Sequence, residues 1–266
     1  MSSLIVGLLG IAVLFILLFA GMPIAYAMAI TGFAGFSFLT SVNVGFNMVA
    51  KEIFNSFSSY NLSVIAMFVW MGFLAYYSGI GSRLYLFAYR LVGHLPGGLA
   101  VATQAACAAF GAICGSNTAT AATMGAIALP EMRKYKYDMS LATASIAAGG
   151  ALGVLIPPSV IFIVYGAATE QSIGRLFIAG IIPGILLTGL YILAISILTY
   201  RNPQLGPTGP KAGWKERLEA LRGGLAEVII IFAVSMGGLF RGWFTPAEAG
   251  AVGTVGVLAV SLYNRN

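Results

Sequence analysis

The chain has 266 residues, of which 59% are hydrophobic and only 8% are charged, and its mean hydropathy is +0.93. Water-soluble domains carry about 25% charged residues, so this composition indicates a protein whose solvent is lipid. The net charge of +6 could suggest a nucleic-acid partner, but the fourteen Lys and Arg residues stand in short groups between apolar runs. This pattern is typical of membrane-protein loops, so we expect no nucleic-acid partner.

Apolar runs of about 17 to 25 residues predict membrane-spanning helices, so the fold class expected is all-α with about seven spans. These runs lie near residues 3–20, 24–40, 60–80, 138–169, 173–200, 225–241 and 246–263. The first run follows no basic segment and ends without an A-x-A-like cleavage site, which favours a retained span over a cleaved signal peptide.

Residues 97–130 form an apolar block that does not fit a simple span. As one helix the block would be about 50 Å long, and its middle is polar from Gly115 to Thr120. Because irregular polar backbone at membrane depth is tolerated only where protein or a water-filled cavity covers it, two half-helices in a re-entrant hairpin are favoured. The alternative is one long tilted helix whose Ser and Thr side chains bond to their own turn.

The positive-inside rule slightly favours the re-entrant hairpin. With the hairpin re-entrant, eleven basic residues fall on the cytoplasmic side and three outside, whereas a single crossing gives ten and four. The eleven are Arg83, Arg90, Arg133, Lys134, Lys136, Arg201, Lys211, Lys215, Arg217, Arg222 and Arg265, and the three are Lys51, Arg175 and Arg241.

An odd number of crossings before the loop at 201–224 predicts that the following segment starts in the opposite orientation. Pro246 opens the last span as Pro23 opens the second, which favours an inverted repeat, although two unrelated helices with proline at the first position explain it equally well. The expected domains are a first repeat, a cytoplasmic loop with an amphipathic helix from Trp214 to Arg222 on the lipid surface, and the start of a second repeat. Their ranges are 1–200 (with hairpin 97–133 and broken helix 138–169), 201–224 and 225–266.

A second polar break interrupts the span 138–169. Pro157 and Pro158 remove two backbone donors, so carbonyl groups around Gly153 to Ile156 are expected to lack helical partners. Such oxygens suit a sodium ion, and the helix ends at the hairpin tip suit a small cation or an anion. Each break could instead be a kink, and the tip residues could be polar contacts between packed helices.

Other candidate groups give little support for catalysis. His94 is the single histidine and has no second ligand partner, and the sequence contains no Walker, H-E-x-x-H or G-x-S-x-G motif, so we expect no enzyme. Glu248 follows Thr245 at the spacing of a capping box, which favours a structural role over an intramembrane functional carboxylate. Glu227 is expected at the membrane interface. Cys107 and Cys114 would be about 10 Å apart on one helix and are expected to be unpaired.

Four motifs occur in an order that resembles the large membrane subunit of tripartite ATP-independent periplasmic (TRAP) transporters, over residues 5–263. They are Gly93-His94-Leu95-Pro96-Gly97-Gly98, Phe110-Gly111-Ala112-Ile113-Cys114-Gly115-Ser116-Asn117-Thr118-Ala119-Thr120, Leu155-Ile156-Pro157-Pro158-Ser159 and Phe244-Thr245-Pro246-Ala247-Glu248-Ala249.

The resemblance implies a multi-pass permease of the bacterial inner membrane, built as the first half of an inverted-repeat, elevator-type transporter. It further implies a sodium ion as coupling ion, no covalent cofactor, an organic-acid substrate such as a C4-dicarboxylate or sialic acid, a small membrane subunit and a periplasmic substrate-binding protein. The residues carried over for substrate are Ser116, Asn117, Thr118, Pro157 and Ser159, and those for sodium are Gly115, Ser116, Asn117, Gly153, Ile156 and Pro158.

Family members carry a second hairpin and a second broken helix, whereas this chain stops at Asn266. Two explanations remain open at this point: a truncated product, or a second chain that supplies the missing repeat. Two other functions also remain, a sodium-coupled divalent-anion symporter that needs no binding protein and a non-transporting membrane scaffold or assembly subunit.

Overall fold

The computed structural model describes residues 3–58 and 60–264, which divide into two compact units, Met1–Ser59 and Tyr60–Asn266. Arg265, one of the residues counted on the cytoplasmic side, lies outside the described residues, and the side chain of Arg222 is also not described. The described residues contain helices and no strand, as the apolar runs predict.

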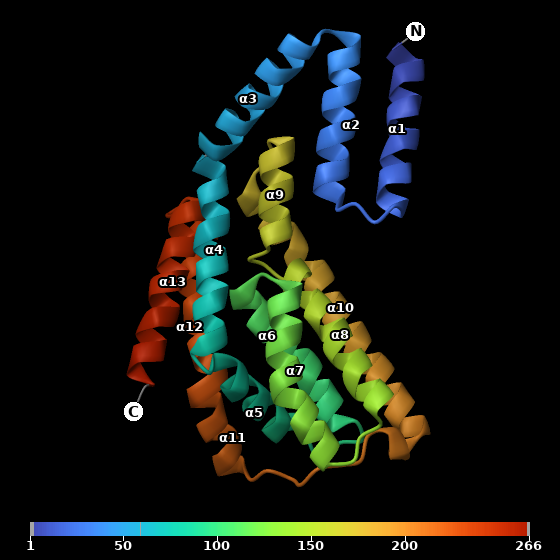
Figure 1. Cartoon of the computed structure of the whole chain (residues 1–266). Coiled ribbons are helices and arrows are strands. Elements are labelled where there is room, and N and C mark those ends of the chain that lie inside the picture. Colours follow the sequence, from blue (N-terminus) through green and yellow to red (C-terminus); the bar gives the residue numbers. More distant parts are fainter. Residues whose placement is uncertain (1–2, 59, 265–266) are drawn as a thin grey trace. The chain divides into compact units, whose positions relative to one another are not determined.

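The first unit consists of α1 (Ser3–Phe19), α2 (Ile24–Leu39) and α3 (Val42–Ser58). α1 packs against α2, and α2 packs against α3 (Figure 1). Gly21 allows the tight turn between α1 and α2 because its φ of 86° is a left-handed conformation that other residues avoid.

The second unit holds the remaining helices, drawn from cyan to red in Figure 1. They are α4 (Tyr60–Tyr77), α5 (Ile80–Val92), α6 (Gly98–Cys114), α7 (Asn117–Lys134), α8 (Met139–Leu155), α9 (Val160–Thr169), α10 (Ile173–Arg201), the 3-10 helix η1 (Pro203–Leu205), α11 (Trp214–Ala220), the π-helix η2 (Leu221–Leu225), α12 (Ala226–Phe240) and α13 (Pro246–Tyr263).

Two groups of helices form the second unit. In one group α13 packs along α4 and α12, and in the other α6, α7 and α8 pack together with α5 and α10 beside them (Figure 1). The α4–α13 contact depends on small residues, since a Cβ on Gly250 would lie 2.8 Å from the Met67 Cβ atom. Small residues let helix backbones approach closely, which is how helices associate in lipid. The buried rings of Phe68 and Phe177 join α4 to α10 edge to face, 5.9 Å apart.

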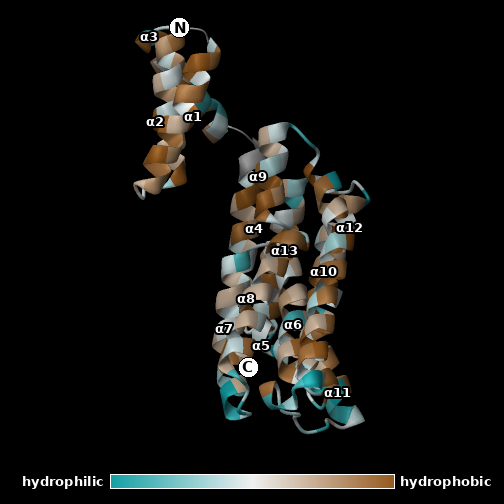
Figure 2. Cartoon of the chain, turned by 90° about the vertical axis from the view of Figure 1, so that its right-hand side faces the viewer, coloured by the Kyte–Doolittle hydropathy of each residue, from teal (hydrophilic) through white to brown (hydrophobic). Residues whose placement is uncertain are grey.

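Helices lie at each of the predicted apolar runs, and four of the described helical segments are long and apolar enough to cross a membrane. These are Met139–Thr169, Ile173–Arg201, Trp214–Phe240 and Pro246–Tyr263, and α3 with α4 would supply a fifth as a broken span. α1, α2 and α6 are apolar but shorter. Hydrophilic residues gather at the end of the second unit formed by α11 and the turn between α7 and α8 (Figure 2), the loops in which the basic residues were counted.

Two helices, α3 and α5, were missed in the sequence because a search for apolar runs does not find helices with polar positions. The predicted span 60–80 is also too long, since α4 ends at Tyr77 before Gly79 turns the chain in a left-handed conformation. The helix expected at 214–222 is present as α11, and its place on the lipid surface stays a prediction. α11 continues through η2 into α12, so Trp214–Phe240 is one continuous helical segment.

Candidate functional site

The polar cluster inside the block 97–130 is the turn of a helical hairpin. α6 ends at Cys114 and α7 begins at Asn117, and the two helices pack together. Gly115 makes the turn with a φ of 64°, which a residue with a Cβ atom adopts only at a cost, and Ser116 follows in an extended conformation. The helix is therefore broken where the sequence predicts it, and a single straight helix is excluded.

Side chains at the hairpin tip bind mainly to the tip itself. The Thr118 main-chain N–H donates to Asn117 Oδ1 at 2.7 Å, and the Ser116 and Thr118 hydroxyls lie 3.1 Å apart. Ser116 also caps α7, because its Oγ accepts from the Ala119 N–H. Asn117 and Thr118 remain exposed, so their oxygens can still bind a ligand.

The second break separates α8 from α9 at Ile156–Ser159. Pro157 and Pro158 have no N–H, so the carbonyl oxygens of Gly153 and Val154 lack their usual helical donors. Ser159 restarts the helix as the N-cap of α9, accepting a hydrogen bond from the Phe162 N–H at 3.4 Å.

The hairpin tip and the broken span are in direct contact. The Val160 N–H, at the start of α9, donates to the Gly115 carbonyl oxygen at 3.2 Å. A Cβ on Gly115 would lie 2.6 Å from the Pro158 carbonyl oxygen, and one on Gly153 would lie 2.8 Å from the Ser116 carbonyl oxygen. Glycine on both sides thus brings main-chain carbonyl groups of the two breaks together.

A cavity of about 570 Å³ opens beside this contact. α4 forms one wall of it with Val69, Gly72, Phe73, Tyr76 and Tyr77, and the other lining residues are Cys114, Gly115, Ser116, Asn117, Ala119, Val154, Val160 and Ile161. The N-terminal ends of α7 and α9 and the C-terminal ends of α6 and α8 therefore all reach the cavity. Helix N-termini attract anions and helix C-termini attract cations, so the cavity offers both kinds of binding end.

The residues predicted from the sequence fall into two groups. Gly115, Ser116 and Asn117 line the cavity, and Thr118 is exposed at the tip outside the lining. The predicted residues of the broken span do not line it: Gly153, Pro157, Pro158 and Ser159 are buried, and Ile156 is half-buried against Gly184 of α10.

Among the described residues no group of three His, Cys, Asp or Glu side chains could hold a metal ion. A cation at this place would be bound by carbonyl and hydroxyl oxygens, which sodium accepts.

Several residues near the site were missed in the sequence. The aromatic wall of α4 has no motif of its own, and only a glycine inside an apolar run, Gly72, could have indicated a close approach. A Cβ at Gly72 would lie 2.7 Å from the Cys114 carbonyl oxygen.

Glu227, expected at the interface, forms an ion pair with Arg83 that no local pattern predicts.

Glu248 forms the predicted capping box. Its carboxylate accepts from the Thr245 N–H at 2.8 Å and from the Thr245 hydroxyl at 2.9 Å, and the Thr245 Oγ1 accepts from the Glu248 N–H. Cys107 and Cys114 are both free and buried, as expected from their spacing.

Comparison with known protein families gives a match to the model of the tripartite ATP-independent periplasmic transporter, DctM component, over residues 11–266. The chain belongs to the TRAP large permease family. Members of this family are transporters of the bacterial inner membrane, not enzymes, and the apolar helices of this chain agree with that location.

Individual relatives of this TRAP permease support the assignment. A C4-dicarboxylate TRAP transporter large permease protein of Vibrio cholerae is 38% identical over 93% of this chain and 54% of its own length. A sialic acid TRAP transporter large permease protein of the same species is 36% identical over 90% and 55%. An ectoine/5-hydroxyectoine TRAP permease of Ruegeria pomeroyi is 35% identical over 89% and 54%. The chain thus spans about half the length of these relatives.

Proposed function

We propose that this chain forms the first half of the solute pathway of a sodium-driven TRAP importer of organic acids. The observation that carries the proposal is the hydrogen bond from Val160 to Gly115, because it joins the hairpin tip to the broken span beside an open cavity.

Both the coupling ion and the substrate would bind at these helix ends. The carbonyl oxygens around Gly153 and Ser116 would coordinate sodium, a hard cation that prefers neutral oxygen ligands, together with those of Gly115, Asn117, Ile156 and Pro158. The N-terminal ends of α7 and α9 would attract the substrate carboxylate. Opposite charges bound close together stabilise each other, so sodium binding would raise the affinity for the acid.

The side chains closest to the substrate would be Ser116, Asn117 and Thr118. They keep polar atoms at the open tip, whereas Ser159 and Pro157 would act from inside the protein by holding the start of α9 in place. The names of the relatives support acids as substrates, since they include a C4-dicarboxylate and sialic acid.

The proposed assembly contains a small membrane subunit and a periplasmic binding protein, and a further segment or a second chain that supplies the other half of the family fold. A sodium-coupled symporter without a binding protein is less well supported, because the named relatives are TRAP transporters. A non-transporting membrane subunit is the second candidate, and the uptake test below distinguishes it from the importer.

The test is uptake of labelled succinate and sialic acid into proteoliposomes that hold this chain, first alone and then in a full mixture. The full mixture adds the candidate small subunit, the binding protein and the segment or chain that supplies the other half of the family fold. An inward sodium gradient should drive uptake only in the full mixture. Sodium alone should stabilise the folded chain by about 1.4 kcal/mol at ten times its dissociation constant. Asn117→Ala should weaken both effects. Thr143→Ala, an exposed residue of α8 whose hydroxyl bonds its own turn, is the matched control.

Three results would count against the proposal. Uptake without a sodium gradient would show that sodium is not the coupling ion. Uptake without the binding protein would favour the symporter that needs no binding protein. A folded chain with neither uptake nor stabilisation by sodium would support a non-transporting subunit.

A further inference from the structure

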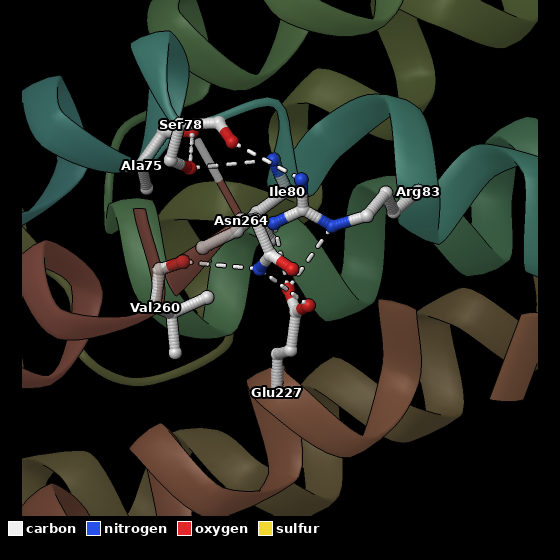
Figure 3. Close-up of polar contacts among 7 residues, drawn as sticks. All are labelled: Ala75, Ser78, Ile80, Arg83, Glu227, Val260 and Asn264. Carbon is white, nitrogen blue, oxygen red and sulfur yellow. Dashed lines mark hydrogen bonds and ion pairs between the residues drawn. The ribbon is translucent and has the colours of Figure 1, made fainter. Parts of the chain in front are cut away.

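An ion pair joins two helices of the second unit that are far apart in the sequence. Arg83 of α5 donates to Glu227 Oε2 of α12 from Nη2 at 2.7 Å and from Nε at 3.1 Å (Figure 3). The other carboxylate oxygen, Oε1, accepts from Asn264 Nδ2 at 3.0 Å, just beyond the end of α13.

The third nitrogen of the guanidinium group reaches a third helix. Arg83 Nη1 donates to the Ser78 carbonyl oxygen, one residue beyond the end of α4, at 3.2 Å. The two charged side chains are 27% and 13% exposed. The pair therefore connects α4, α5, α12 and α13 at one point, and it is shielded enough to matter more than a surface ion pair.

The backbone of α5 is also held against the π-helix η2. A Cβ on Gly224 would lie 2.7 Å from the Arg83 carbonyl oxygen, so η2 lies directly on α5. Near the other end of α5, Arg90 Nη1 donates to the Glu216 carbonyl oxygen of α11 at 2.8 Å. Within the described chain, α5 is thus attached along its length to the segment α11–η2–α12.

α5 is the link in the chain between α4 and the hairpin. α5 begins directly after Gly79, and α6 begins directly after Gly97. Both glycines turn the chain sharply, with left-handed φ values of 73° and 70°. α5 packs against α6, whereas α4 packs along α13. α4 and α12 also contact the hairpin directly, but α5 packs against both of its helices, α6 and α7, so the position of α5 helps to set how the hairpin sits relative to α12 and α13.

We propose that Arg83 and Glu227 are positioning residues of the transport site: their ion pair fixes α5 and, through α5, the hairpin tip. This inference rests on the proposed function for its effect on transport, but its structural part stands alone. Without the pair, α5 keeps its apolar face on α6 and loses its polar attachment to α12 and α13. The hairpin then becomes more mobile, although its own residues are unchanged.

The first measurement is amide hydrogen exchange of the full chain in nanodiscs, for the native protein, Arg83→Gln, Glu227→Gln and the double variant. We expect each single variant to speed exchange about tenfold in residues 80–92 and also at the tip, 115–120. The double variant should resemble the more affected single variant, because the two residues act as one unit. Arg83→Lys keeps the charge but offers one nitrogen in place of three, so it should keep more of the protection than Arg83→Gln and less than the native chain.

The matched control is Glu131→Gln, which removes an exposed ion pair to Lys134 with a 3.8 Å separation. It should leave exchange at the tip unchanged. A thermal-shift measurement identifies a variant that has failed to fold, and Arg83→Lys then remains as the informative comparison.

The second measurement is the uptake assay described above, in which the single variants should lower the maximal rate and leave the half-saturation concentration unchanged. Unchanged exchange at residues 115–120 in the folded single variants would overturn the inference, as would additive effects in the double variant. If the full mixture with the native chain shows no uptake, the proposed function fails while the exchange data still decide the role of the pair.

Discussion

The main-chain N–H of Val160 donates a hydrogen bond to the carbonyl oxygen of Gly115, so the first residue of α9 lies at the turn of the hairpin 45 positions earlier in the chain (160 minus 115). The donor is free for this bond because it belongs to a helix N-terminus, where N–H groups have no partner within the helix. The start of α9 thus supplies a hydrogen-bond donor to the carbonyl group at the turn of the hairpin.

Gly115→Ala should destabilise the protein and displace the hairpin tip. Alanine would have to adopt the left-handed φ of Gly115, which costs about 1–2 kcal/mol of stability. Its Cβ atom would also lie 2.6 Å from the Pro158 carbonyl oxygen. Thermal unfolding in detergent measures the effect. Gly189→Ala in α10, where a Cβ meets nothing within 4 Å, is the control and should be neutral or stabilising, because alanine favours a helix more than glycine does. Equal melting temperatures for both variants would show that the tip tolerates a side chain.

Gly153→Ala tests the contact between carbonyl groups of the two breaks. Its Cβ would lie 2.6 Å from Thr120 Oγ1 and 2.8 Å from the Ser116 carbonyl oxygen, so the tip must move away from α8. We expect stabilisation by sodium to fall by about 1 kcal/mol or more, the loss of a tenfold excess over the dissociation constant. Gly125→Ala, with its nearest atom at 3.7 Å, should keep the full response. Retention of the response in Gly153→Ala would argue against a sodium site here.

Tyr137→Phe should destabilise the start of the hairpin by about 1–2 kcal/mol, because the buried Leu99 N–H loses its acceptor, the Tyr137 hydroxyl at 3.1 Å. Tyr200→Phe, at a position that is 83% exposed, is the control for chemical denaturation. A native-like denaturation midpoint for Tyr137→Phe would mean that water replaces the hydroxyl.

The same residue predicts a pH dependence. Burial raises the pKa of Tyr137, although the hydrogen bond from Leu99 acts in the opposite direction. Because the folded-state pKa exceeds the unfolded value of about 10, the contribution to stability is complete below pH 10 and is lost as the pH rises through the folded-state value. Between pH 8 and pH 11 the melting temperature should fall more for the native chain than for Tyr137→Phe. Equal falls would show that ionisation of Tyr137 does not cause the pH dependence.

Thr245→Ala should lower stability by about 1 kcal/mol, because α13 loses its N-cap, whereas Glu248→Gln should be mild, since Gln also completes a capping box. Thermal unfolding of both variants distinguishes the two expectations. The comparison also tests the alternative of a functional carboxylate. If Glu248→Gln is stable but abolishes the response to sodium, Glu248 acts in transport and not only as a cap.

Both breaks at the candidate site could be predicted from the sequence because their causes are local. Gly115 permits a left-handed turn, Ser116 caps the following helix, and two prolines remove two donors wherever they occur in a span. The capping box of Glu248 was predictable for the same reason. The search for apolar runs missed α3 and α5, because polar positions interrupt the apolar runs in both helices.

The sequence by itself determined the membrane class, the apolar spans, the positions of the breaks and the family motifs, because each follows from residues that are neighbours in the chain. Only the tertiary structure decided that Gly115 meets Val160, that α4 forms the cavity wall, and that Arg83 pairs with Glu227 across 144 positions. Those contacts depend on how closely helices approach, which glycine and alanine permit at many places, and packing selects among them.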